Sequence, residues 1–167
     1  MRVHRSLIVA CLIVALGVTG CATNDSRSAQ ISDLPTATST VQRGRASQGP
    51  ITIADARVVP AGAGTPTRIY LTIRNDGAVA DTVTAVRSNV SAETRLERGG
   101  TDARSSPLDM LPVPARGTVA LTPGGVWVAL PGAAPLIIGG TVVVTFTLAR
   151  AGQVDVFTPI EPSGVGD

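Results

Sequence analysis

Strict alternation of apolar and polar residues constrains the fold of this chain more than any other feature. Within residues 68–74 and 142–149, every second residue is a large apolar one. Successive side chains of a strand point to opposite faces of a sheet, so this pattern predicts strands with one buried face. The same pattern recurs in shorter segments, namely Ile51–Val59, Thr82–Val86, Thr94–Glu97, Thr118–Leu121, Val126–Leu130 and Val154–Phe157.

The segments between these predicted strands are short and typical of turns. They include Asn75–Gly77, Gly99–Gly100, Pro123–Gly125 and Gly139–Gly140, whereas no long segment has a helical period. Gly, Pro, Asn and Asp favour the backbone angles that tight turns require. Seven or eight short strands with this spacing predict an all-β fold, either an antiparallel Greek-key β-sandwich or a Greek-key barrel.

A secretory signal precedes the predicted β domain. Residues 1–20 run from a basic start through the apolar stretch Leu7–Leu16 to small residues before Cys21. This stretch is too short to span a bilayer, which requires about 20 apolar residues. Cys21 occupies the lipobox position at which bacterial lipoproteins are cut and acylated, so the sequence predicts its lipidation. The alternative, a buried cysteine in a core helix, would require an amphipathic period that residues 1–20 lack.

Removal of the signal leaves a chain with little catalytic or metal-binding chemistry. The only histidine, His4, and one of the two cysteines, Cys11, lie in the signal. A Ser-His-Asp triad and a free cysteine nucleophile are therefore excluded, and we expect no enzymatic activity. Met110 is the only methionine left, and a single thioether does not hold copper tightly. It is more simply interpreted as a gap-filling core or loop residue.

The charge balance of residues 21–167 argues against nucleic acid as a partner. Loss of Arg2 and Arg5 leaves twelve arginines against twelve acidic residues, and only four residues are aromatic. A nucleic-acid-binding protein usually carries a basic stripe for the phosphates and aromatic side chains on which bases stack.

Composition divides the chain into four parts. Residues 1–20 are the predicted signal peptide, and residues 21–49 are lipidated Cys21 and a disordered tether rich in Ser, Thr, Ala and Gln. Residues 50–160 form the predicted β domain, and residues 161–167, with their Pro and Gly, are expected to form a flexible tail.

Four segments of the domain together resemble the PCuAC family of periplasmic copper chaperones. These segments are Ile51–Arg57, Tyr70–Gly77, Val113–Leu121 with the turn Pro123–Gly125, and Gly140–Gly152. Each one alone is ordinary strand and turn chemistry, and it is their order along residues 50–160 that carries the resemblance. The resemblance implies a cupredoxin-like β-sandwich, in agreement with the alternation.

The resemblance also implies where a copper site would lie. The resemblance implies a site built from a central His, nearby methionines and a His-x-Met pair after the Pro-Gly-Gly turn. Side chains at positions i and i+2 of a strand share a face, so such a pair can converge on one Cu(I) ion. The central His falls on or near Glu97, the pair falls on Trp127 and Ala129, and the methionines fall in Gly99–Ser106, which contains none. We therefore expect no bound metal and no other cofactor. The chain resembles the ligand-poor, lipid-anchored, LpqE-like actinobacterial relatives of the family.

Trp127 admits two interpretations. If Val126, Val128 and Leu130 point inward, Trp127 faces outward or into a shallow groove, where an exposed indole would suit contact with a partner. The alternative is that Trp127 caps the end of the sandwich by ordinary packing, with its N–H bonded to a nearby carbonyl.

Three functions are compatible with these observations. The predicted one is a non-catalytic binding or accessory module, lipid-anchored at the extracytoplasmic face of the cell membrane and serving an unknown envelope protein. The second is a copper chaperone or copper homeostasis protein that uses ligands supplied by a partner. The third is an enzyme of unrecognised type.

Overall fold

The computed structural model describes residues 42–60, 66–99 and 104–162. It confirms the all-β prediction, because these residues form eleven strands and no helix. Nothing in the described ranges could therefore cross a bilayer as a helix. The strands are β1 (Gly44–Gln48), β2 (Ile51–Val59), β3 (Thr67–Asn75), β4 (Asp81–Ser88), β5 (Arg95–Gly99), β6 (Ser105–Pro107), β7 (Leu111–Val113), β8 (Thr118–Leu121), β9 (Val126–Leu130), β10 (Thr141–Leu148) and β11 (Gly152–Pro159).

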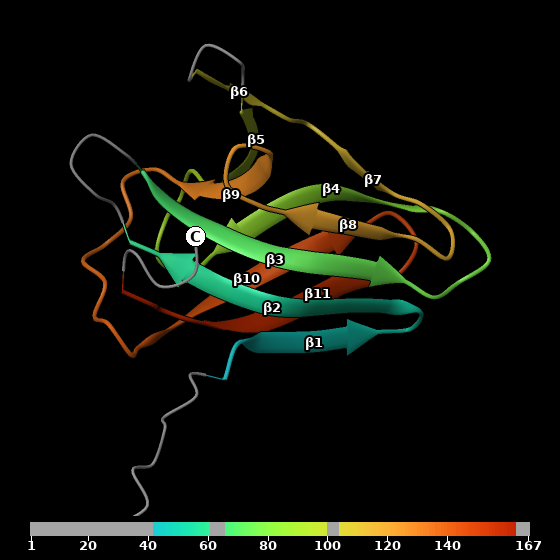
Figure 1. The fold of residues 1–167 in the computed structure, drawn as a ribbon, viewed down its shortest axis with the longest axis horizontal. Helices are drawn as coiled ribbons and strands as arrows, with labels where there is room; N and C mark the ends of the chain where they lie inside the picture. The colour runs from blue at the N-terminus through green and yellow to red at the C-terminus, as the bar shows by residue number, and fades with distance from the viewer. Residues whose placement is uncertain (1–41, 61–65, 100–103, 163–167) are drawn as a thin grey trace, which may run out of the picture. The chain divides into compact units, whose positions relative to one another are not determined.

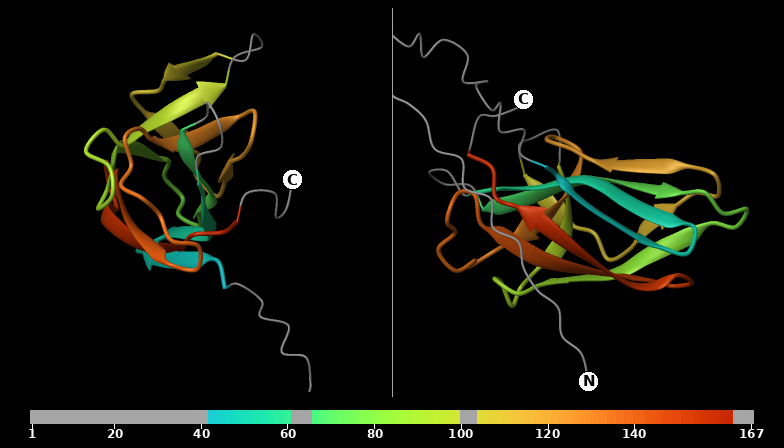
Figure 2. Two further views of the ribbon diagram at one scale, coloured as in Figure 1. Left: turned by 90° about the vertical axis from the view of Figure 1, so that its left-hand side faces the viewer. Right: turned by 90° about the horizontal axis from the view of Figure 1, so that it is seen from below.

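The strands form two sheets that face each other (Figures 1 and 2). Sheet A has the order β1-β2-β3-β9-β5-β6, with β8 also paired to β3. Sheet B has the order β11-β10-β4-β7. All pairings between these strands are antiparallel. The chain passes to sheet B for β4, returns to sheet A for β5 and β6, passes to sheet B again for β7, returns for β8 and β9, and ends in sheet B with β10 and β11. The antiparallel sandwich predicted from the sequence is thus confirmed.

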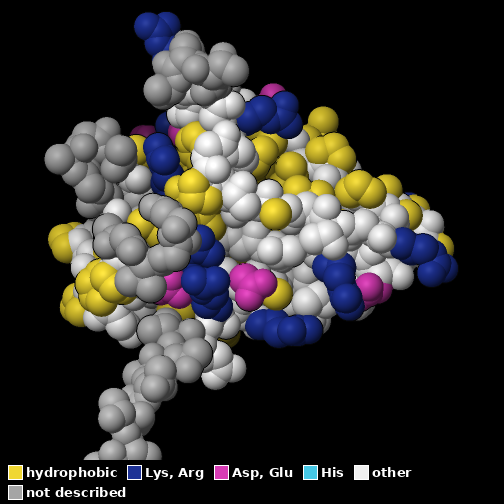
Figure 3. Space-filling view, viewed as in Figure 1, with side chains coloured by type: hydrophobic (Ala, Val, Ile, Leu, Met, Phe, Trp, Pro, Cys, Tyr) yellow, Lys and Arg dark blue, Asp and Glu magenta, His cyan; other side chains and the backbone are white. Residues whose placement is uncertain are grey.

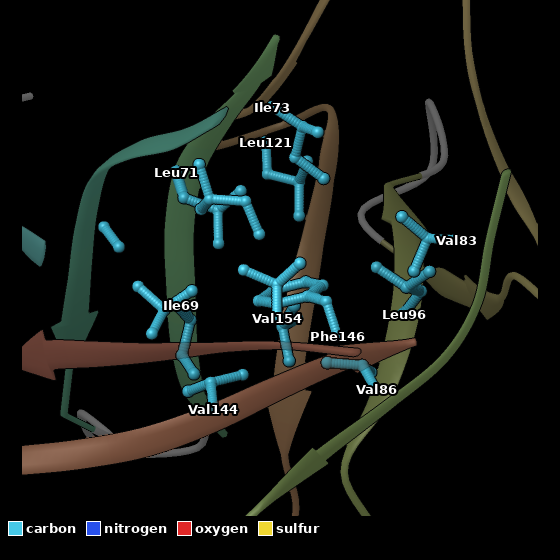
Figure 4. Packing of buried hydrophobic residues seen from close by; sticks show 14 of the residues in the cluster. Ile69, Leu71, Ile73, Val83, Val86, Leu96, Leu121, Val144, Phe146 and Val154 are labelled. Atoms are coloured by element: carbon cyan, nitrogen blue, oxygen red, sulfur yellow. The ribbon is translucent and has the colours of Figure 1, made fainter. Parts of the chain in front are cut away.

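The core lies between the sheets and is built from the alternating residues. Ile69, Leu71 and Ile73 of β3 are at most 3% exposed, as are Val144 and Phe146 of β10 (Figure 4). Burial of a side chain of this size contributes roughly 1.5–3 kcal/mol to folding. The polar residues that alternate with them in β3 consequently lie on the outer face of sheet A.

A β-bulge in β2 changes which residues of that strand face outward. Ala54 pairs with Thr72 but Arg57 pairs with Tyr70, so β2 has one residue more than β3 between these pairs. Asp55 in the bulge has a φ of 56°, a left-handed conformation that Asp tolerates better than most residues. The bulge places Arg57 on the outer face of sheet A, opposite Tyr70.

The prediction of a tether over residues 21–49 is wrong for residues 44–48. These residues form β1, which pairs with the edge of β2 and brings Gly44 against the backbone of Phe157 in β11. The sequence GRASQ has no large apolar residue and so gives no alternating pattern. The strand is held instead by backbone hydrogen bonds at the sheet edge and by the absence of a side chain at Gly44. The rest of the predicted tether, Cys21 and the predicted signal lie outside the described residues.

The predicted tail also begins too early. Glu161 is only 4% exposed, and its backbone N–H donates to the carbonyl oxygen of Val58 at 2.9 Å. Its side chain pairs with Arg43, so the domain extends to this residue. A charged residue next to a Pro gave no sign of burial in the sequence. Residues 163–167 lie outside the described part of the chain.

Candidate functional site

The structure brings together the three positions on which the copper ligands of the resembling family would fall. Glu97 of β5 lies directly opposite Trp127 of β9, and Arg95 lies opposite Ala129 in the same ladder. Trp127 and Ala129 are two residues apart on one strand, so their side chains share a face. That face is the outer one of sheet A, because the intervening Val128 is fully buried in the core.

The Glu97 carboxylate is buried and already paired on both oxygens. The side chain of Arg95 lies 2.9 Å from Oε1, and Ser105 Oγ donates to Oε2 at 2.8 Å. Glu97 is 5% exposed, and a buried carboxylate requires such partners because the loss of hydration is costly. The position therefore carries an internal ion pair in which both carboxylate oxygens are engaged.

The interpretation of Trp127 as an exposed contact residue is wrong. Trp127 is 4% exposed and packs with Tyr70 and Ala129 in a small cluster on the outer face of sheet A, separate from the main core. The guanidinium of Arg68, which lies opposite Ala129 in the β3–β9 ladder, sits 4.5 Å from the centre of the indole ring and covers it. Trp127 is thus packed, although on the outer face of the sheet and not as an end cap.

Two buried N–H donors in this cluster lack an acceptor. In the part of the chain that the structure describes, neither Trp127 Nε1 nor Arg68 Nε has a hydrogen-bond partner. The predicted bond from Trp127 to a nearby carbonyl is therefore not made. Leaving a buried donor unpaired costs about 1–3 kcal/mol, so native proteins rarely do so without a reason. Both atoms are sealed from solvent, so an acceptor from outside the domain would reach them only after the Arg68 side chain moved off the indole.

A second charged group borders the cluster on β2. Arg57 lies 5.4 Å from the centre of the Tyr70 ring, and its Nε is 3.9 Å from Glu161 Oε2. Arg43 Nε donates to the other oxygen of Glu161 at 3.2 Å. Sequence analysis did not single out Arg57 or Arg68. The alternation in β3 could have placed Arg68 beside Tyr70, but the position of Arg57 depends on the bulge.

The side chains around Glu97 are not ligands that suit copper, the metal of the family that the sequence resembles. Within residues 42–60, 66–99 and 104–162, no group of three or more His, Cys, Asp or Glu side chains is placed to hold a metal ion. Cu(I) prefers thioether, thiolate and imidazole ligands, whereas the positions here offer a paired carboxylate, an indole and a methyl group. Met110, 58% exposed, lies in the connection between β6 and β7.

A shallow pocket at the other end of β3 has its polar groups occupied by structural bonds. It is lined by Asn75, Val79, Asp81 and Arg150 among others. Burial opposes ionisation of Asp81, but bonds from the backbone N–H groups of Thr82, Ala151 and Arg150, together with the Arg150 charge, hold its pKa below the ordinary value. The Asp81 carboxylate thus anchors the β10–β11 turn to β4.

Comparisons with known proteins agree with this fold. A family model described as "Putative lipoprotein LpqE-like" matches residues 51–160. The apo PCuAC domain of PmoF2 is 19% identical with a TM-score of 0.62, covering 72% of this chain and 97% of that domain. The apo PCuAC domain of PmoF1 is 22% identical with a TM-score of 0.61, covering 71% and 98%. Apo-DR1885 from Deinococcus radiodurans is 19% identical with a TM-score of 0.54, covering 95% and 100%.

The comparisons confirm two predictions made from the sequence. The chain is similar to PCuAC domains, as the order of its motifs indicated, and the sandwich is of the cupredoxin-like type. A search of curated protein sequences found no match.

Proposed function

The chain belongs to the LpqE-like lipoprotein family, and from this premise we propose that it is a lipid-anchored envelope protein without copper-binding or catalytic activity. Its PCuAC-like domain acts as a binding or accessory module on the extracytoplasmic side of the membrane. The lipobox at Cys21 supports the anchor, and the absence of histidine from residues 21–167 supports a non-catalytic role.

One observation carries the loss of copper binding. Glu97, Trp127 and Ala129 lie together on the outer face of sheet A, where the family's ligands would converge, yet each one has a different task. Glu97 is paired with Arg95 and Ser105, Trp127 lies under a guanidinium, and Ala129 offers only a methyl group.

The same cluster defines the kind of partner that the module would bind. Arg68 makes no ion pair with a described residue, and both its Nε and Trp127 Nε1 are donors without acceptors. A carboxylate or a backbone carbonyl of an envelope protein would supply the missing acceptor once the Arg68 side chain moved off the indole. A bond to the charged guanidinium would be the stronger of the two.

A copper titration tests the first part of this proposal. Residues 21–167 are prepared without a histidine tag, and Cu(I) is offered in competition with a chromogenic chelator. We expect no binding at submicromolar affinity. One equivalent held more tightly than that would return the protein to the copper chaperones, and binding that appears only with an envelope partner would favour shared ligands.

In-cell photo-cross-linking tests the partner. A photoreactive residue replaces Val59 in one variant and Arg74 in another. Val59 lies opposite Arg68 and packs against the cluster without supplying a donor, whereas Arg74 is distant from the donors. We expect a distinct cross-linked envelope protein from position 59 and not from position 74. Identical products from both positions, or none from either, would contradict a binding site at this cluster.

A further inference from the structure

The connection between β9 and β10 exposes two large aliphatic side chains. Ile137 is 79% exposed and Ile138 is 53% exposed, whereas the neighbouring Leu136 packs against the core. The loop is held in a tight turn, because the Gly140 N–H donates to the carbonyl oxygen of Ile137 at 2.9 Å and Gly139 has a φ of 83°. The two isoleucines are therefore presented to the outside by a fixed backbone.

This loop is bonded to Ile160, directly after β11 and one residue before the contact with the start of the described chain. Gly139 N–H donates to the carbonyl oxygen of Ile160 at 3.0 Å, and Ile160 N–H donates back to Gly140 at 2.9 Å. The next residue, Glu161, accepts a hydrogen bond from Arg43, near the start of the described chain. In Figure 3, hydrophobic side chains lie at the left-hand end of the face, where the β9–β10 connection of Figure 1 lies, and a second group covers the upper right.

The chemistry of the loop fits a lipid surface. Residues 131–141 contain no charged side chain, so entry into the acyl region would bury no ion. Small soluble domains rarely display clustered aliphatic side chains without a contact that covers them. A protein partner would also cover such a patch, but the position of the loop beside the entering chain favours the membrane that this chain would reach.

We propose that Ile137 and Ile138 insert into the outer surface of the membrane and hold the domain against it. The inference rests on the proposed anchor at Cys21. Twenty residues, 22–41, separate Cys21 from Gln42, and a flexible coil of that length has a root-mean-square reach of about 25 Å. Two isoleucines alone bind a bilayer weakly, but the anchor keeps them at a high effective concentration beside it.

The proposal fixes which end of the sandwich faces the lipid. Leu130 pairs with Thr67, so the β9–β10 loop and the start of β3 lie at the same end, and this end faces the membrane. The opposite end, with Val79 after β3, faces away from the membrane.

Quenching of tryptophan by brominated lipids tests this orientation. The protein used is residues 21–167, which contains the whole described core and whose only cysteine is Cys21. Cys21 is coupled to a maleimide lipid in phosphatidylcholine and phosphatidylglycerol vesicles with brominated acyl chains. Two variants are compared with the parent, Ile138→Trp and Val79→Trp, since these side chains are 53% and 54% exposed at opposite ends. The buried Trp127 gives the same background in all three proteins.

We expect quenching of the Ile138→Trp variant to exceed that of the Val79→Trp variant by at least about twofold, since bromine quenches only an indole at acyl depth. An Ile137→Trp variant gives a second reading from the same loop. Equal quenching at both ends, or none above the parent at either loop position, would overturn the proposal. A Leu136→Trp reporter is also combined with Ile137→Ser and Ile138→Ser. If these serines abolish the cross-link of the in-cell experiment while quenching of the reporter is unchanged, the loop contacts a protein partner, which would also overturn the proposal.

Chemical coupling keeps this test separate from the proposed function. Flotation of the vesicles measures attachment directly, so a protein that floats but shows no quenching refutes the loop contact alone. A natural protein that is not acylated at Cys21 refutes the anchor and leaves the vesicle result unaffected.

Discussion

Glu97 lies directly opposite Trp127 across the β5–β9 ladder, and both side chains are buried on the outer face of sheet A. Side chains in such a pair have Cβ atoms about 4.5–5.5 Å apart, close enough for both to contribute to one site. Here Arg95 and Ser105 satisfy the carboxylate, while Trp127 and Arg68 keep donors without acceptors. Both oxygens of the carboxylate are thus engaged, whereas two N–H donors lack acceptors, which favours an acceptor group over a metal ion as the ligand.

Replacement of Asp81 by Asn tests the anchoring of the β10–β11 turn. Asp81 Oδ1 accepts from Arg150 N–H and Oδ2 from Ala151 N–H, each at 2.9 Å. An amide has only one oxygen, so one N–H loses its acceptor, at a cost of about 1–3 kcal/mol in the free energy of unfolding. Urea denaturation at pH 7 measures the loss.

The same variant has a defined pH dependence. The folded-state pKa of Asp81 lies below its unfolded value, so its contribution is complete above about pH 4 and is lost as the pH falls through the folded-state pKa. We therefore expect the difference between wild type and Asp81→Asn to shrink in acid. Asp76→Asn is the control, because the exposed Arg74–Asp76 pair should contribute little. An equal effect from both substitutions would contradict the role of Asp81.

Removal of β1 tests the revised boundary of the domain. A chain that begins at Gly49 loses the ladder from Gly44 to Gln48 and the packing of Ala46 against the core. Each lost ladder bond costs about 1 kcal/mol net, so a loss of several bonds should lower the melting temperature by roughly 10 °C. Calorimetry compares this chain with one that begins at Gln42, which should melt like residues 21–167. Equal melting of all three would show that β1 contributes nothing.

The sequence predicted the core because burial follows alternation. In β3 and β10 the large apolar residues recur at every second position, so the strands and their inner faces could be read directly. β1 could not be read, since its sequence GRASQ is held by backbone pairing at a sheet edge. The bulge at Asp55 interrupts the period of β2, and its effect on Arg57 became visible only with the register.

The candidate site was predicted only in part, for a related reason. The strand period places Trp127 and Ala129 on one face, but it does not say what covers them. The cover is Arg68, which lies 59 positions earlier in the chain and meets Trp127 through the β3–β9 pairing. Partners so far apart in sequence are fixed by topology and long-range register, which a single sequence does not contain.

Replacement of Cys21 by Ala tests the anchor. Diacylglycerol on the thiol carries two acyl chains, and each buried CH₂ contributes about 0.8 kcal/mol, so attachment should be stable where a single chain would be marginal. The Cys21→Ala variant should leave the membrane fraction or accumulate as uncut precursor. Fractionation and mass measurement of the mature protein check this. Release of the wild-type protein by salt, or unchanged processing of the variant, would show that the lipobox prediction is wrong.

Restoration of a copper site provides the strongest test of how the family's ligands map onto this chain. The variant Glu97→His, Trp127→His and Ala129→Met places two imidazoles directly across the β5–β9 ladder and a thioether two residues along on the same face. These are ligand types that Cu(I) prefers. We expect the affinity for Cu(I) to rise to submicromolar or tighter, measured by competition against a chromogenic chelator on untagged protein. The double variant without Glu97→His should bind more weakly, because it lacks one imidazole.

Arg68 decides how far the restored site can tighten. Its guanidinium covers position 127 and would place a positive charge beside the bound cation, so adding Arg68→Gln should strengthen binding beyond the triple variant. The Trp127→His change also removes buried volume, so each variant must first show a cooperative thermal transition before its affinity is compared. Folded triple and quadruple variants that bind Cu(I) no better than wild type would show that the family's ligand positions lie elsewhere in this sandwich. Tight binding by the triple variant alone would instead show that Arg68 is swung clear of the ion, and that the cover on Trp127 opens without a partner.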